Sequence, residues 1–166
     1  MVEPNVNDIK AIPARIATVL ERERRKRALA HHQMAAFIRE RSGDRLFSVW
    51  TYHDVVFQRT PLTIARVGGM AEALGLPIAD LLVDDAPDWA RRIDLSWLKM
   101  RIGVRLEMER SARRLGHGEF ADMLGLTART YRRYVLGEAN PDIGRIAALA
   151  SLVGETPTQF MFSRLH

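Results

Sequence analysis

The chain of 166 residues is 47% hydrophobic and 27% charged, which indicates one globular domain or two small ones and excludes a disordered chain. It contains no cysteine, which excludes disulfides, thiolate metal sites and a cysteine nucleophile. Residues 1–88 contain as many acidic as basic residues, so the formal net charge of +5 resides in residues 89–166 and indicates a polyanionic partner.

The first 83 residues show helical apolar periodicity and almost none of the alternation that predicts strands. Residues 22–27 form a basic run. It either lies at a solvated helix end, where cations are favourable, or contacts phosphates. Residues 39–45 form a polar, glycine-containing stretch, after which Ser48 is expected to cap a helix over residues 49–58.

The acidic, proline-containing segment 84–94 is predicted to be a linker between domains of residues 1–83 and 95–166. Beyond it, Ser96 is expected to cap a helix that runs to about Arg114. The apolar side of that helix is predicted to consist of Trp97, Leu98, Ile102, Leu106 and Met108.

Four shorter helices are predicted to follow. The first covers residues 117–124 and ends at Gly125, in the left-handed conformation typical of a C-terminal glycine. The second covers residues 128–136, begins after Thr127, ends at Gly137 and buries Tyr131 and Tyr134. The last two begin at Pro141-Asp142 and at Pro157.

The first half repeats this plan. An offset of 86 residues pairs Ile16 with Ile102, and an offset of 79 pairs Tyr52 with Tyr131. The change of offset places an insertion around residues 39–45. The simplest interpretation is two tandem units of five helices each.

A short helix, a glycine turn and a second short helix are typical of the helix-turn-helix. Residues 102–161 resemble Cro/cI-type (xenobiotic-response-element) helix-turn-helix regulators. The resemblance rests on Ala121, Gly125, Leu126-Thr127, Tyr131, Tyr134, the exit from Gly137 to Pro141, and Ala150 with Gly154. It implies an all-α fold of two tandem five-helix lambda-repressor-like helix-turn-helix domains, of which the first is degenerate.

The resemblance implies that helix 128–136 reads duplex DNA in the major groove. The expected DNA contacts are His117, Thr127, Ala128, Arg129, Thr130, Arg132 and Arg133. Arginine can form two hydrogen bonds to guanine, so Arg129 and Arg133 are expected to contact bases, with Arg132 and Thr127 nearer phosphates. The alternative is that these arginines form a solvated basic face.

Two departures from the family pattern affect this expectation. Val135 stands where relatives often have an acidic residue that pairs with an arginine of the first helix, so Arg110 is expected to be free for a phosphate or another partner. Residues 138–140 lack the basic contacts of many relatives. Fewer basic contacts predict weaker binding to the DNA backbone, which a second subunit or the first domain would have to reinforce.

The first unit leaves two hypotheses open: a second DNA reader, which makes the chain a covalent pseudo-dimer, or a dimerisation or partner-binding module. Its candidate contacts are Arg24, Arg25, Arg27, Trp50, Thr51 and His53. Asp54 aligns with Arg133, and an acid there repels phosphate.

No catalytic set, metal-ligand spacing or cofactor motif is present, so we expect a protein that is not an enzyme and needs no cofactor or metal. The N-terminal residues do not form a signal peptide and no apolar run is long enough to span a membrane. We therefore expect a cytoplasmic, nucleoid-associated regulator, repressor or activator, that binds double-stranded DNA as a homodimer or pseudo-dimer. The alternative is a protein-interaction module with this fold: an antitoxin, an anti-activator or a co-activator that binds RNA polymerase.

Overall fold

The computed structural model describes residues 6–163, which form helices and, apart from one isolated bridge, no β-structure. The helices are α1 (Val6–Lys26), α2 (His31–Ser42), α3 (Val49–Val56), α4 (Ile64–Leu74), α5 (Ile78–Leu82), α6 (Asp88–Arg91), α7 (Leu95–Ala112), α8 (His117–Met123), α9 (Ala128–Val135), α10 (Ile143–Leu152) and α11 (Pro157–Phe162). The predicted all-α class is confirmed for these residues. None of their helices could span a bilayer.

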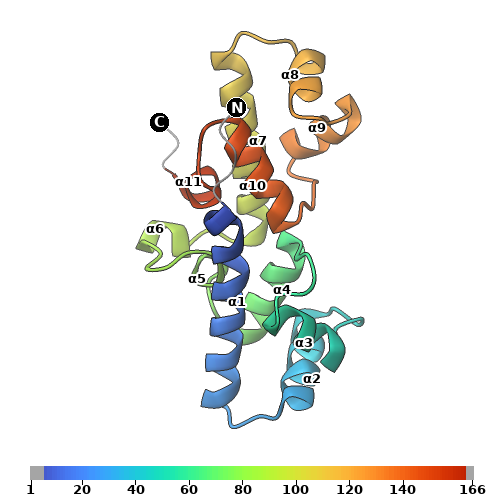
Figure 1. The fold of residues 1–166 in the computed structure, drawn as a ribbon, viewed down its shortest axis with the longest axis vertical. Coiled ribbons are helices and arrows are strands. Elements are labelled where there is room, and N and C mark those ends of the chain that lie inside the picture. Colours follow the sequence, from blue (N-terminus) through green and yellow to red (C-terminus); the bar gives the residue numbers. More distant parts are fainter. Residues whose placement is uncertain (1–5, 164–166) are drawn as a thin grey trace.

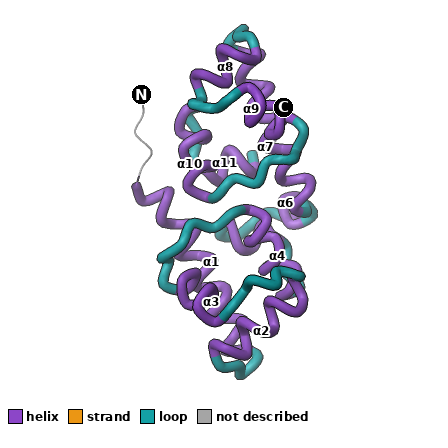
Figure 2. Tube along the Cα trace, turned by 90° about the vertical axis from the view of Figure 1, so that its right-hand side faces the viewer, coloured by secondary structure: helices purple, strands orange, loops and turns teal. Residues whose placement is uncertain are grey.

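The molecule is elongated and carries a pair of short helices at each end (Figure 1). Helices α8 and α9 lie at one end, and α2 and α3 lie at the other. Figure 2 shows that α10 and α11 accompany α7 in one half, whereas α1 and α4 lie in the other half. The middle of the molecule is therefore the place where the two halves meet.

Side-chain caps explain where most of the helices begin. Thr127 and Asp142 accept hydrogen bonds from backbone N–H groups of the first turns of α9 and α10, as Ser48 does for α3. Helix α7 begins earlier than predicted, because the Asp94 carboxylate accepts from the Trp97 N–H at 2.8 Å. The prediction that Ser96 is the N-cap is wrong.

Gly125 and Gly137 follow the ends of α8 and α9 with φ of +63° and +69°. Both lie in the left-handed region, which glycine occupies without strain from a Cβ. The prediction that Gly125 ends the first short helix in this conformation is confirmed.

Segment 84–94, the predicted linker, includes helix α6, whose Ala90 is fully buried. Arg91 of the same helix donates two hydrogen bonds to the Asp80 carboxylate of α5.

The prediction that Trp97 lies on the apolar side of α7 is wrong: its side chain is 64% exposed, whereas its neighbour Leu98 is buried. The earlier start of α7 does not change its periodicity; Trp97 simply lies outside the stripe of Leu98, Ile102 and Leu106.

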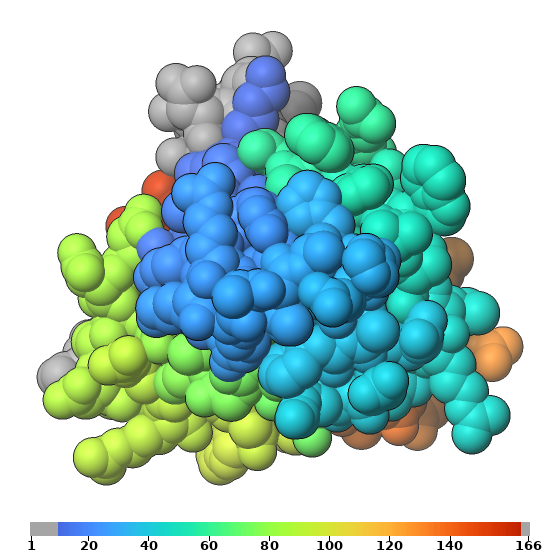
Figure 3. Space-filling model, turned by 90° about the horizontal axis from the view of Figure 1, so that it is seen from below, coloured from blue at the N-terminus to red at the C-terminus, as the bar shows by residue number. Residues whose placement is uncertain are grey.

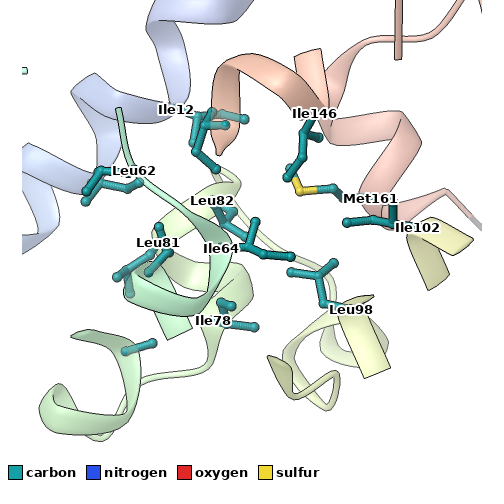
Figure 4. Packing of buried hydrophobic residues seen from close by; sticks show 14 of the residues in the cluster. Ile12, Leu62, Ile64, Ile78, Leu81, Leu82, Leu98, Ile102, Ile146 and Met161 are labelled. Carbon is teal, nitrogen blue, oxygen red and sulfur yellow. The ribbon is translucent and has the colours of Figure 1, made fainter. Parts of the chain in front are cut away.

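The hydrophobic core continues across the middle of the molecule. Figure 4 shows side chains of the first half, including Ile12, Ile64 and Leu82, in one cluster with Leu98 and Ile146 of the second. Each such side chain removed from water contributes roughly 1.5–3 kcal/mol of hydrophobic stabilisation. The two halves therefore share part of their core.

Main-chain hydrogen bonds join the halves at the starts of α4 and α10. The N–H of Ile64 donates to the Pro141 carbonyl at 2.9 Å, and the N–H of Ile143 donates to the Leu62 carbonyl at 2.9 Å. These bonds surround the antiparallel bridge between Thr63 and Asp142, the capping residues of α4 and α10. The 79-residue offset pairs the two donors, Ile64 and Ile143, and the two acceptors, Leu62 and Pro141. The two bonds are therefore equivalent to each other, and the junction has an approximate twofold symmetry.

Gly103 marks the closest approach of α7 to α9. A Cβ at this position would overlap the backbone carbonyl of Tyr134, which cannot rotate away. We expect Gly103→Ala to lower the free energy of unfolding by about 1–3 kcal/mol, as overpacking does, measured by urea denaturation. Gly118→Ala is the control, because Gly118 lies in α8 with open space around it. Equal stability of both variants would contradict close packing of α7 on α9.

Candidate nucleic-acid interface

Helices α8 and α9 are joined by a tight turn over residues 124–127. The Thr127 hydroxyl accepts from the Thr130 N–H at 3.1 Å, which fixes the start of α9. On the other side of the turn, the Leu126 N–H donates to the Ala121 carbonyl of α8. The two short helices are thus held at a fixed angle, as a helix-turn-helix requires.

The inner face of α9 is buried through two tyrosines. Tyr131 and Tyr134 are both buried, as predicted, and Phe120 of α8 packs edge-to-face against Tyr131 with ring centroids 5.7 Å apart. Burial of this face leaves the opposite face of α9 to solvent, with its orientation set by the core.

The outer face of α9 carries the predicted contacts. Ala128, Arg129, Arg132 and Arg133 are exposed, as is Thr127 at the helix start, and Thr130 is half-buried. Within residues 6–163 no carboxylate pairs with the three arginines; Arg133 donates to the Glu138 carbonyl at 3.3 Å. The face therefore has an uncompensated positive charge available to a polyanion.

His117 lies at the start of α8, at the end of the helix opposite the turn, and its side chain is 68% exposed. Its Nε2 is 3.6 Å from a carboxylate oxygen of Glu107 on α7. The position is open to solvent at the helix N-terminus, where the aligned peptide dipoles favour an anion.

Of the two predicted alternatives for Arg110, a phosphate or another partner, the structure shows another partner. Arg110 forms an ion pair with Glu107 at 3.1 Å and donates to the Leu115 carbonyl at 2.8 Å. The Tyr131 hydroxyl donates to the same carboxylate. Glu107, three residues before Arg110 on α7, thus supplies the acidic partner that the sequence lacks at Val135.

Burial opposes ionisation of Glu107, but hydrogen bonds from Arg110 and Tyr131 outweigh it and lower the pKa of the carboxyl group. Burial, and then the hydrogen bond to Glu107, raise the pKa of the Tyr131 phenol. The tyrosine therefore remains a neutral donor and Glu107 a charged acceptor, a pair that anchors α9 to α7.

Arg145 of α10 is a supporting residue that the sequence did not reveal. One of its terminal nitrogens donates to the carbonyls of Leu124 and Gly125 in the turn, at 3.2 and 3.3 Å. It satisfies carbonyls at the end of α8 that have no partner in the helix. No local pattern predicts this contact, because the residues are about twenty positions apart in the chain.

The first half contains the same cluster of acid, arginine and tyrosine. Arg24 forms an ion pair with Glu21 at 2.8 Å, and the Tyr52 hydroxyl donates to Glu21 at 2.7 Å. Arg27 is likewise paired with Glu23 at 2.6 Å. Of the three predicted arginine contacts of this half, Arg25 alone is exposed and lacks a partner among the described residues.

The outer face of α3 differs in chemistry from that of α9. Trp50, 74% exposed, occupies the position of Arg129, while His53 and Asp54 occupy those of Arg132 and Arg133. Thr51 hydrogen-bonds to the cap residue Ser48. His53 bonds to His31 of α2 at 3.0 Å and contacts the Trp50 ring. The face is aromatic rather than basic.

The arrangement of α8, its turn and α9 is that of a helix-turn-helix, and residues 117–160 match the helix-turn-helix family. Over 64 residues the chain is 31% identical to the SPbeta prophage-derived uncharacterized HTH-type transcriptional regulator YonR of Bacillus subtilis (strain 168). That match covers 39% of this chain and 58% of the relative, so it spans little more than half of the relative. No solved structure matches the chain. The chain thus contains a helix-turn-helix domain at residues 117–160.

Glu21 gives the first half a pH-dependent contribution to stability. The hydrogen bond that Arg24 donates lowers the pKa of Glu21 from 4.5 to about 2. Burial of the carboxyl group opposes this shift, and the hydrogen bond from the Tyr52 hydroxyl adds to it. A lowered pKa stabilises the fold above pH 4.5, and this contribution is lost as the pH falls toward 2. We expect Glu21→Gln to lower the Tm at pH 7, with the difference from wild type shrinking as the pH falls through this range.

The control for this series is Glu40→Gln, since Glu40 is exposed on α2 and has no ion pair among the described residues. Thermal melts followed by circular dichroism at a series of pH values measure both variants. A Tm difference for Glu21→Gln that stays constant down to pH 2 would show that the carboxylate charge does not contribute.

Proposed function

We propose that this protein is a sequence-specific regulator of transcription that binds duplex DNA and reads the major groove with α9. The observation that carries the proposal is the outer face of α9, where three exposed arginines project from a matched helix-turn-helix and have no carboxylate partner among residues 6–163. The excess positive charge of residues 89–166 supports it. The relative is named as a transcriptional regulator, which agrees with this function.

Each residue of the face has a proposed role. Arg129 and Arg133 contact guanine edges, and Ala128 and Thr130 contact thymine methyl groups. Thr127, Arg132 and His117 lie toward the phosphates and set the register of α9 in the groove. The Glu107–Tyr131 pair and Arg145 hold the helix and its turn without touching DNA.

We further propose that the chain is a tandem pair of lambda-repressor-like helix-turn-helix domains, residues 1–83 and 95–166. Equivalent residues make equivalent contacts in the two halves: Glu21 with Tyr52, and Glu107 with Tyr131. Ala28 and Arg114, which correspond under the 86-residue offset, both adopt positive φ. These correspondences support duplication more strongly than the low sequence identity does.

Only the second domain is proposed to read bases. Asp54 repels phosphate at the position of Arg133, and Arg24 and Arg27 are engaged in ion pairs. A single reading helix covers only one half-site, so we propose that two copies bind a palindromic operator as a homodimer. Such a regulator acts where the DNA is, at the nucleoid in the cytoplasm, and needs no cofactor for this readout.

Selection of bound sequences from a random duplex library tests the function. At about 0.15 M salt, where phosphate contacts alone bind weakly, we expect the full chain to enrich one motif. A palindrome would agree with two copies of one reading helix, whereas two unlike halves would show that α3 also reads DNA. Binding without enrichment that disappears as salt rises would overturn sequence-specific recognition.

Substitution of Arg129 tests the proposed readout. We expect Arg129→Ala to weaken binding to the selected motif by about 1–3 kcal/mol and to relax the preference at one base position. Trp50→Ala is the matched control at the equivalent position of the first half, and we expect it to leave affinity unchanged. Equal weakening on all sequences would make Arg129 a phosphate contact.

A further inference from the structure

The basic run at residues 22–27 borders a groove that the proposed DNA-reading face does not use. The groove lies between the C-terminal half of α1 and the end of α3, and encloses about 760 Å³. Its floor is formed by Ala14, Ala17 and Val56, and its rim by Arg22, Arg25 and Lys26. Figure 3 looks onto this end of the molecule, where α1 and α2 appear in blue.

The charges of the rim are only partly neutralised. Glu23, which is buried, is shared by Lys26 at 3.0 Å, Arg22 at 3.4 Å and Arg27 at 2.6 Å, so one carboxylate serves three cations. Glu21 also lines the groove but is bound by Arg24 and Tyr52. The rim therefore keeps a net positive charge above an apolar floor.

The second half carries other residues at the positions that line the groove. At the positions equivalent to Ala14 and Thr18, α7 carries Met100 and Val104. The Met100 Sδ lies 2.6 Å from where a Cβ of Gly137 would be, so Met100 has room because residue 137 is a glycine; the first half has the small Ala14 and, at the position of Gly137, Gln58. In place of Arg22, Arg25 and Lys26, the second half carries Met108, Ser111 and Ala112.

We propose that this groove docks an acidic amphipathic helix of a partner protein. The apolar side of that helix would cover Ala14, Ala17 and Val56, and its carboxylates would pair with Arg22, Arg25 and Lys26. A phosphate backbone would use the rim but would leave the apolar floor uncovered, so the floor favours a peptide.

Two sets of substitutions, both copied from the second half, separate the contribution of the apolar floor to peptide binding from that of the charged rim. Ala14→Met with Thr18→Val and Gln58→Gly fills the groove without changing its charge; glycine at position 58 leaves room for the methionine, as Gly137 does for Met100. Arg22→Met, Arg25→Ser and Lys26→Ala discharge the rim without filling it. The same residue types occupy the equivalent positions of the second half, and circular dichroism with thermal melts checks that both variants fold.

The probe is a display library of helical peptides about 14 residues long, with randomised apolar residues on one face and Asp or Glu on the other. Selection uses the immobilised full chain, and enriched peptides are measured by fluorescence polarisation. We expect enriched peptides to lose at least about tenfold in affinity on each variant and to bind more weakly as salt rises. Neither variant should alter the affinity for the selected DNA motif, because α9 is unchanged.

Three results would overturn the docking proposal. The first is the absence of any enriched peptide, and the second is equal binding of the enriched peptides to wild type and both variants. The third is a loss of DNA affinity on discharging the rim but not on filling the groove, which would make the rim a phosphate contact. Failure of DNA selection by the wild-type chain affects only the proposed function, since the peptide measurement contains no DNA.

Discussion

A tyrosine hydroxyl that donates to a glutamate of the long helix holds each pair of short helices to its half of the molecule. In the second half the donor is Tyr131 and the acceptor is Glu107, which Arg110 keeps ionised. A charged acceptor strengthens this hydrogen bond, and partial burial protects it from water. The orientation of α9, and with it the direction of its arginines, follows from this contact and from the close approach at Gly103.

The same interaction in the first half shows how one scaffold carries two different surfaces. Glu21, Arg24 and Tyr52 repeat the anchoring cluster, yet the exposed positions of α3 are occupied by Trp50, His53 and Asp54. The positive charge of this half lies instead beside the α1 groove. The anchoring cluster is thus the same in both halves, whereas the exposed residues of α3 and α9 differ. Packing constrains the anchoring residues, but the exposed residues face solvent and are free to differ.

The junction in the middle combines the two halves into one body. Main-chain bonds around Thr63 and Asp142 leave little freedom for the halves to rotate, and the core continues beneath them. Asn140 takes part in this junction by accepting from the Ala65 N–H at 3.0 Å. A residue of the segment 138–140, which carries no basic side chain, is therefore used for assembly, and the spacing of α3 and α9 is set within the chain.

Several contacts could not be predicted from the sequence, for a common physical reason. Local rules placed Ser96 as the cap of α7 and left the partner of Arg110 open, whereas Asp94, directly before α7, is the cap and Glu107, one turn from Arg110, is the partner. Both contacts are local, but choosing between competing partners requires knowing which face of the helix is buried. Trp97 was misplaced because an apolar residue type does not by itself specify burial.

The sequence by itself determined the helical class, the positions of Gly125 and Gly137, the burial of Tyr131 and Tyr134, and the basic face of α9. These features depend on periodicity and on backbone conformations that few residues adopt, which are properties of neighbours in the chain. Only the tertiary structure decided which arginines are free, how Arg145 holds the turn, and that Ala14 and Thr18 leave a groove open. The turn contact and the groove depend on residues that are distant in sequence within one half. The partner that each arginine takes depends on which face of its helix the packing of that half buries.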